Sequence, residues 1–261
     1  AKASTRKYDD AEATTMLRPD LTGRTALVTG SATGVGRALL LGLADCGASV
    51  AVHYRSSEET AREVAAAARE MGAPEVTTVQ GDVADPDDVD AMFDAIEEDL
   101  GSVDVLVNNV GPFAPDHWED ISYEEWNTVL QANVNGTYLC CKRALPEMRE
   151  EAWGRIVNIG YASAEKGMMS PKNAPYFIAK QGVLMFTRML ANDTQYEGIT
   201  VNAVSPYVVE NSDEFPEDLP RGRPADFEDV EQAMLFFLDE DSDYISGENI
   251  EVDGGWLPEE V

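Results

Sequence analysis

Short apolar runs alternate with longer amphipathic segments along this chain, and these two patterns predict strands and helices in turn. The apolar runs are rich in Val, Ile and Ala and end at Gly, Asp or Asn, as is usual for strands covered on both faces. Seven strands are expected, over Thr25–Thr29, Ser49–Tyr54, Glu75–Gln80, Val103–Val107, Arg155–Ile159, Thr200–Val204 and Asn249–Val252.

The segments between these runs repeat their apolar residues at helical spacing. Helices are expected from Gly36 through Leu43 and over Ser57–Met71, Pro86–Gly101, Tyr123–Met148 in two pieces, Ala174–Tyr196 and Phe227–Leu238. This alternation predicts an α/β fold, a single-domain Rossmann-type doubly wound parallel sheet of about seven strands with helices on both faces. The ligand of such a sheet should lie at the carboxyl ends of its strands.

The length of 261 residues suits one large domain and is short for two. Residues 1–20 are polar and lack an apolar period, so we expect a mobile N-terminal arm followed by one domain over residues 21–261. No apolar run approaches the length of a membrane span, and the first twenty residues lack the apolar core of a secretory signal.

The first predicted strand leads into a turn that contains Gly30, Gly34 and Gly36, where a helix begins. Glycines let a backbone approach an anion closely, and the free N–H groups and positive dipole end of the helix face that anion. The spacing Thr-Gly-x-x-x-Gly-x-Gly therefore predicts a site for the pyrophosphate of a dinucleotide. A purely structural turn with helix-packing glycines is the alternative for this stretch alone.

The charge balance limits the partners that the chain can bind. The chain carries 49 acidic residues against 19 Lys and Arg, a net charge of −30, which excludes nucleic acid and anionic membranes as partners. One interpretation is an ordinary, well-solvated acidic surface. The other is adaptation to a cytoplasm of molar salt, because lysines are scarce, and the stability of the chain at different KCl concentrations tests it.

Cysteine and histidine usage bears on metals and compartment. Cys46, Cys140 and Cys141 suit packing positions in a reducing compartment, so we expect a cytoplasmic protein. His53 and His117 have no cysteine cluster near them, which predicts no catalytic metal.

Tyr176 and Lys180 are candidates for chemistry because they are four residues apart near the start of a predicted helix and so share a face. An ammonium beside a phenol lowers the pKa of the phenol, which would make Tyr176 a proton donor to a carbonyl group under reduction. Taken alone, the pair is better explained as an ordinary helix surface.

These residues occur with other motifs in an order that resembles the short-chain dehydrogenase/reductase family along nearly the whole chain after residue 20. The matching motifs are Thr29-Gly30-x-x-x-Gly34-x-Gly36, Asp82-Val83, Asn108-Asn109-Val110-Gly111, Asn133, Tyr176-x-x-x-Lys180, Asn202 with Ser205-Pro206, and Asp253-Gly254-Gly255. The resemblance implies hydride transfer between a nicotinamide cofactor and a small-molecule carbonyl or alcohol. It also implies a homo-oligomer, a tetramer or dimer.

The resemblance further implies roles for single residues. Tyr176 would be the acid/base and, with Lys180, a cofactor-binding residue. Lys180 would hold the nicotinamide ribose and tune Tyr176, and Asn133 would support a water that relays protons to Lys180. Asp82 would contact the adenine, while Asn108 would line the cofactor cleft. The remaining cofactor-binding candidates are Thr29, Gly30, Ser31, Thr33, Gly34, Val35, Gly36, Val83, Asn109, Gly111, Pro206 and Asn211, the last standing where a threonine commonly holds the carboxamide.

The chain departs from the family at the serine that hydrogen-bonds the substrate oxygen. Counting from the fifth predicted strand places this serine at Tyr161, whereas counting back from Tyr176 places it at Ser163. Ser163 is the favoured candidate, with Tyr161 as a hydroxyl substitute. A site without either donor would polarise the carbonyl poorly.

The end of the second predicted strand indicates which cofactor binds. An acidic residue there would accept hydrogen bonds from a bare ribose, but no acid precedes Glu58. Arg55 can pair with a 2′-phosphate, and neighbouring hydroxyls can add hydrogen bonds, which predicts NADP(H). An arginine on a solvated loop is the alternative. The cofactor-binding candidates in this stretch are His53, Tyr54, Arg55, Ser56 and Ser57.

The function expected from these features is NADPH-dependent reduction of a carbonyl, and relatives with this layout suggest a 3-oxoacyl thioester as substrate. A pteridine, sugar or other ketone reductase is the alternative within the same class. The missing serine also allows a non-catalytic NADP-binding regulatory protein, although the intact Tyr176 and Lys180 argue against it.

Overall fold

A computed structural model describes residues 17–162, 164, 170–212 and 215–256 of the chain. The described residues form a seven-stranded sheet in which every neighbouring pair is parallel, in the order β3-β2-β1-β4-β5-β6-β7. Its strands are β1 (Thr25–Val28), β2 (Ser49–Tyr54), β3 (Val76–Gln80), β4 (Val105–Asn108), β5 (Gly154–Ile159), β6 (Ile199–Pro206) and β7 (Asn249–Val252). The order reverses between β1 and β4, the kind of switch point where doubly wound sheets bind ligands.

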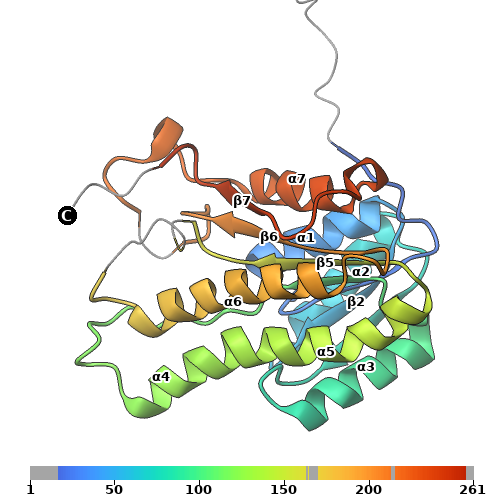
Figure 1. The fold of residues 1–261 in the computed structure, drawn as a ribbon, viewed down its shortest axis with the longest axis horizontal. Helices are drawn as coiled ribbons and strands as arrows, with labels where there is room; N and C mark the ends of the chain where they lie inside the picture. Colours follow the sequence, from blue (N-terminus) through green and yellow to red (C-terminus); the bar gives the residue numbers. More distant parts are fainter. Residues whose placement is uncertain (1–16, 163, 165–169, 213–214, 257–261) are drawn as a thin grey trace, which may run out of the picture.

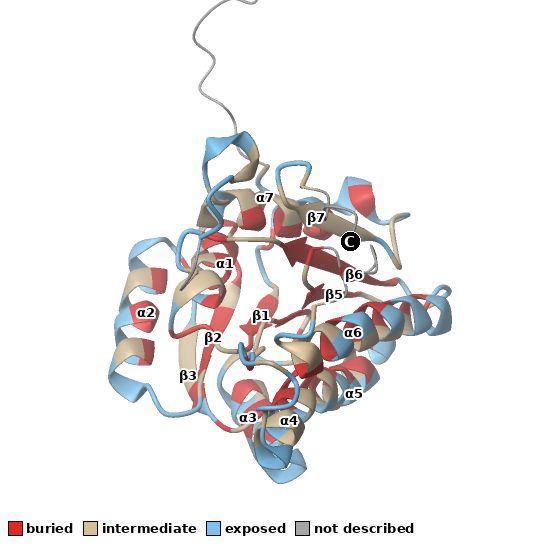
Figure 2. Ribbon diagram, turned by 90° about the vertical axis from the view of Figure 1, so that its left-hand side faces the viewer, coloured by how far each residue is buried: buried red, intermediate tan, exposed pale blue. Residues whose placement is uncertain are grey.

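Helices cover both faces of this sheet, as Figures 1 and 2 show. One face carries α1 (Gly34–Asp45), α2 (Glu58–Glu70) and α7 (Phe227–Leu238), whose apolar residues share a core with β1 and β2. The other face carries α3 (Pro86–Leu100), α4 (Tyr123–Leu130), α5 (Gly136–Glu150) and α6 (Ala174–Asp193). These observations confirm the predicted fold class.

The observed elements differ from the predicted ones in a few details. Strand β6 continues to Pro206 because Ser205 pairs with Glu251 and Pro206 pairs with Val252 of β7. The helix predicted over Tyr123–Met148 is continuous but contains a π-helical turn at Gln131–Asn135 between α4 and α5, which accounts for its two pieces. Short 3-10 turns at Pro220–Gly222 and Glu240–Ser242 complete the described elements.

Residues 17–20, which the sequence assigned to a mobile arm, are instead fixed to the domain. The Leu17 N–H donates to Gln232 Oε1 at 3.0 Å, and Arg18 forms an ion pair with Asp45. These contacts attach the segment to α7 and α1, so the sequence boundary was placed too late. No helix in the described part of the chain has the length and apolar character needed to cross a bilayer.

Candidate active site

The turn after β1 is held in place by the loop that follows β4. Thr29 Oγ1 accepts hydrogen bonds from the Asn109 and Val110 N–H groups at 2.9 and 3.1 Å, and Asn109 Nδ2 donates to Thr29 O at 2.9 Å. At Gly36 a Cβ would lie only 2.5 Å from both Asn109 Nδ2 and Gly30 O. Glycine is therefore required there for α1 to approach the turn so closely.

The amino end of α1 is arranged to receive an anion. Thr33 occupies the N-cap position, but its side chain makes no capping hydrogen bond, and no acidic residue lies in the first turn. The first amides of the helix thus remain available, and the helix dipole favours negative charge at this position. This geometry fits the pyrophosphate of a dinucleotide.

A hollow of about 310 Å³ beside this turn collects most of the predicted adenine-side residues. Its lining includes Gly30, Thr33, His53, Tyr54, Arg55, Ser56, Ser57, Asp82, Val83 and Gly111. Arg55 is 68% exposed, and its Nη1 lies 3.5 Å from Asp82 Oδ2. The hollow therefore offers one exposed guanidinium, which can pair with a phosphate, beside a carboxylate, which can accept hydrogen bonds from an adenine amino group.

A second cleft of about 560 Å³ at the carboxyl ends of β4, β5 and β6 brings the catalytic candidates together. The predicted residues that line it are Val35, Asn109, Gly111, Tyr176, Lys180, Pro206 and Asn211. Tyr176 and Lys180 project from the first turns of α6, and Lys180 Nζ lies 5.5 Å from the centre of the Tyr176 ring. The helical spacing thus places both side chains in one cleft.

The electrostatics of this pair differ from the sequence expectation. Burial raises the pKa of Tyr176 above its usual value, and the neighbouring Tyr161 adds to the increase. Burial also lowers the pKa of Lys180 to about 7. The net shift of the Tyr176 pKa is therefore opposite to the expected lowering, because desolvation of the phenol dominates and the buried lysine itself loses charge near neutral pH.

Lys180 is held by a backbone carbonyl rather than by an acid. Its Nζ donates to Ile159 O at 2.7 Å, and only 3% of the residue is exposed. A Cβ on Gly111 would lie 2.8 Å from Lys180 Nζ and 2.8 Å from Asn133 Oδ1, so the absence of a side chain at Gly111 leaves room for both groups.

Asn133 lies in the π-helical turn between α4 and α5. Its Nδ2 donates to Pro112 O and Val129 O, each at 2.9 Å, whereas its buried Oδ1 has no hydrogen-bond partner in the described chain. A buried acceptor without a partner is costly, so it marks a place for a water or ligand donor. Because Oδ1 and Lys180 Nζ both border Gly111, that place adjoins the lysine.

Of the two candidates for the serine role, Ser163 lies outside the described residues. Tyr161 follows β5 and lies in the cleft, with its ring centroid 5.7 Å from that of Tyr176 at an interplanar angle of 72°. Burial and the nearby Tyr207 raise the pKa of Tyr161 to about 12. Its phenol therefore remains protonated and can donate a hydrogen bond near neutral pH.

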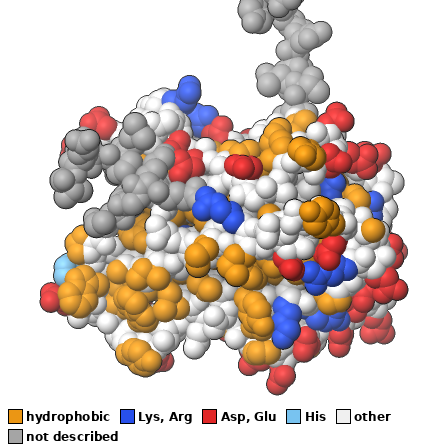
Figure 3. All heavy atoms as spheres, viewed as in Figure 1, with side chains coloured by type: hydrophobic (Ala, Val, Ile, Leu, Met, Phe, Trp, Pro, Cys, Tyr) orange, Lys and Arg blue, Asp and Glu red, His pale blue; other side chains and the backbone are white. Residues whose placement is uncertain are grey.

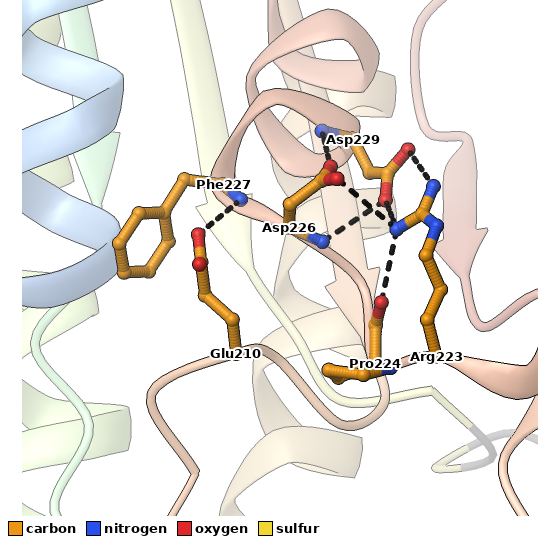
Figure 4. A network of polar contacts seen from close by, with 6 residues as sticks. All are labelled: Glu210, Arg223, Pro224, Asp226, Phe227 and Asp229. Carbon is orange, nitrogen blue, oxygen red and sulfur yellow. Dashed lines mark hydrogen bonds and ion pairs between the residues drawn. The ribbon is translucent and has the colours of Figure 1, made fainter.

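The loop after β6 closes one side of the cleft and carries Asn211. The Asn211 side chain lies against the glycine turn, since a Cβ on Gly34 would stand 2.9 Å from Asn211 Nδ2. Figure 4 shows how the loop is anchored to the start of α7. Arg223 forks onto Asp229 at 2.6 and 3.1 Å, and Glu210 Oε1 accepts from the Phe227 N–H at 3.1 Å.

Sequence reasoning missed Asn173, which precedes α6 and lines the same cleft. Asn173 has a positive φ of 57°, its Oδ1 accepts from the Ala114 N–H at 2.9 Å, and its N–H donates to Asp116 O at 3.0 Å. These bonds tie the loop after β4 to the helix start that carries Tyr176. The only signal in the sequence is an asparagine two residues before Pro175, a weak indication of a helix start.

Comparison with known proteins agrees with this geometry. A family model described as "Enoyl-(Acyl carrier protein) reductase" matches residues 30–257. The chain is 34% identical over 242 residues to a 3-oxoacyl-acyl-carrier-protein reductase of Staphylococcus aureus, an alignment that covers 89% of this chain and 97% of the relative. The chain belongs to the short-chain dehydrogenase/reductase family.

Further similarities place this family member among oxidoreductases with different substrates. It is 34% identical to 3beta-hydroxysteroid dehydrogenase 1 of Eggerthella lenta, with 90% of this chain and 94% of the relative covered. A gluconate 5-dehydrogenase of Burkholderia cenocepacia, solved with NADP and tartrate, superposes with a TM-score of 0.83 at 29% identity and covers 92% of this chain and 97% of its own. The chain is therefore an oxidoreductase that uses a nicotinamide cofactor to interconvert a carbonyl and an alcohol.

Proposed function

We propose that this oxidoreductase uses NADPH to reduce the ketone of a 3-oxoacyl thioester. The observation that supports this reaction is that Tyr176 and Lys180 line one cleft next to the glycine turn, with the unpartnered Asn133 Oδ1 bordering Gly111 beside Lys180. The substrate class rests on the 3-oxoacyl reductase to which the chain is similar over almost its full length. The steroid relative supports another ketone as the second candidate.

The residues of the chain have distinct roles in this proposal. The bound nicotinamide supplies the hydride. Tyr176 donates the proton to the carbonyl oxygen, and its raised pKa keeps the phenol protonated and thus ready for reduction. Lys180 lies beside Asn133 Oδ1 and passes protons from that place to Tyr176 after each turnover. Its pKa of about 7 lets it take up and release protons near neutral pH.

A substrate panel tests the proposed function. Purified protein is mixed with NADPH or NADH and with an acetoacetyl thioester, a hydroxysteroid-type ketone, a keto-sugar or an oxidised pteridine, and loss of the reduced cofactor is followed by absorbance. Turnover of the acetoacetyl thioester with NADPH is expected to exceed the others. NADPH binding without turnover of any of these compounds would instead favour a non-catalytic regulatory protein.

We further propose that Tyr161 supplies the second hydroxyl that polarises the substrate oxygen. Its ring packs edge-on against Tyr176, and burial raises the pKa of both phenols, which keeps each of them protonated and able to donate. Tyr161→Phe should lower kcat by about 100-fold, the usual cost of removing one donor to a developing oxyanion. The matched variant Ser163→Ala should change kcat little, and the reverse pattern would assign the role to Ser163.

We also infer that copies of the chain associate through the face of α5 and α6, on which Figure 3 shows apolar side chains, and that association requires salt. The face has exposed apolar side chains on α5 and α6, namely Tyr138, Ile178, Met185 and Met189. A net charge of −30 opposes association unless it is screened.

In about 2 M KCl, where the Debye length is only a few ångströms, light scattering should therefore detect an oligomer. At about 0.05 M KCl, where charges act over longer distances, the chain should dissociate and unfold at a lower temperature. The variant Met185→Glu should remain a monomer in both buffers. Equal mass and equal melting temperature at the two salt concentrations would exclude both the salt adaptation and its coupling to assembly.

A further inference from the structure

His53, on β2, borders the hollow but is buried against the glycine turn, with 2% of the residue exposed. Its Nδ1 accepts a hydrogen bond from the Gly30 N–H at 2.7 Å, and its Nε2 lies 3.0 Å from Gly81 O. A carbonyl can only accept, so the ring proton must be on Nε2. These two contacts therefore require a neutral imidazole of one tautomer.

The backbone of His53 is bonded to the same turn. The Ser31 N–H donates to His53 O at 3.0 Å, and the His53 N–H donates to Ser31 Oγ at 2.9 Å. His53 thus uses the amides of both Gly30 and Ser31. Because these two amides are occupied, the amides at the start of α1 are the ones that can face an anion.

The second ring contact reaches the opposite wall of the hollow. Gly81 immediately precedes Asp82, and both residues line the hollow together with Gly30 and His53. The imidazole consequently joins the phosphate side of the hollow to its adenine side. A change in its hydrogen bonding would move both walls.

We propose that His53 is a positioning residue for NADPH, whose neutral imidazole holds the glycine turn in its binding geometry and whose protonation weakens cofactor binding. This inference rests on the proposed NADPH-dependent function. Protonation of Nδ1 would set an N–H donor against the Gly30 N–H, replacing a hydrogen bond by a repulsive contact. The turn would then have to move away from β2.

The surroundings of the ring set the direction of this pH effect. Burial lowers the pKa of His53, whereas its bond to Gly81 O and the nearby Asp82 act in the opposite direction. Arg55 pairs with Asp82 and moderates that attraction, while the glycine turn and Asn109 present neutral groups. Because the folded-state pKa lies below the unfolded value of about 6.5, the neutral ring stabilises the fold above that pH. This contribution, and with it NADPH affinity, decreases as the pH falls.

NADPH binding to the intact protein tests the inference without any substrate. Fluorescence titrations from about pH 4 to pH 8 extend below the ordinary imidazole range, because burial lowers the pKa of His53, and they compare wild type with His53→Phe and His53→Asn. His53→Phe removes the acceptor and should raise the Kd by about tenfold at pH 8, the cost of leaving one buried N–H without a partner. His53→Asn keeps an acceptor near Gly30 but cannot titrate, so its Kd should stay close to wild type and lose the acid-side increase.

Two further readouts separate positioning from a general loss of structure. In both His53 variants any loss of activity should be in the KM for NADPH rather than in the KM for the carbonyl substrate, and His117→Phe, at a half-buried histidine that lines neither hollow, should behave like wild type throughout. Lys180 also titrates near neutrality, but it is present in every variant, so the difference between wild type and His53→Asn isolates the imidazole.

An acid-side weakening that persists in His53→Asn would overturn the inference even if His53→Phe failed to fold. An unchanged Kd in a folded His53→Phe, as judged by its thermal unfolding, would also overturn it while leaving the proposed function intact. A wild type with no affinity for NADPH would remove the proposed function and this inference together.

Discussion

Tyr176→Phe is expected to lower kcat for carbonyl reduction by about 1,000-fold, within the range that general acid catalysis contributes. The substitution removes the phenol hydroxyl and keeps the ring that packs against Phe113 and Tyr161. Within the described part of the chain, the hydroxyl of Tyr176 makes none of the hydrogen bonds that hold the cleft together, so its removal leaves no described polar group without a partner. The free energy of unfolding should therefore stay near that of wild type.

The measurement combines steady-state rates with a separate titration of NADPH. Cofactor affinity should be unchanged within about twofold, because Tyr176 acts on the carbonyl and the glycine turn binds the phosphates. Tyr196→Phe, at an exposed tyrosine beyond the end of α6, provides the matched control and should retain full activity. A Tyr176→Phe variant with wild-type kcat would show that another group donates the proton, and the proposed mechanism would have to be abandoned.

Arg55→Asp is expected to shift the ratio of kcat/KM for NADPH over that for NADH by about 100-fold towards NADH, as loss of a charge-assisted contact and gain of a repulsion together imply. In the structure Arg55 is exposed and pairs with Asp82 across 3.5 Å, so its guanidinium can move to a 2′-phosphate without breaking a short bond. The new carboxylate would repel that phosphate and accept hydrogen bonds from a bare ribose.

The interaction of Arg55 with the 2′-phosphate is electrostatic and Arg55 is exposed to solvent, so the change in cofactor selectivity should become smaller as the KCl concentration rises. Measurements of both cofactors are therefore needed at one low and one high salt concentration. Arg62→Asp on α2 is the matched control, because Arg62 is 72% exposed and pairs with Glu58 within its own helix. Unchanged selectivity in Arg55→Asp, or an equal change in Arg62→Asp, would show that Arg55 does not read the 2′-phosphate.

Features that depend on spacing within one helix or one turn could be predicted from the sequence. Tyr176 and Lys180 share a cleft because a four-residue separation on a helix fixes their common face, and the glycines after β1 mark the turn because few other residues tolerate such close contacts. The strand and helix periods likewise predicted a parallel sheet, since burial on both faces demands continuous apolar runs.

Other features depend on residues that lie far apart in the chain. The pKa of Tyr176 is governed by how completely neighbouring elements bury it, so its net shift is upward, opposite to the direction expected from Lys180 alone. His53 could be placed on a strand, but its two bonds to Gly30 and Gly81 arise only when β1, β2 and β3 lie side by side.

The sequence by itself thus determined the order of strands and helices, the turn for the phosphates and the helix that carries Tyr176 and Lys180, because each depends on contacts within a few residues. Only the tertiary structure decided which groups are buried, which donors find partners and how the walls of the cleft are joined. Desolvation and hydrogen bonding between distant segments are set by packing, and local spacing carries no information about either.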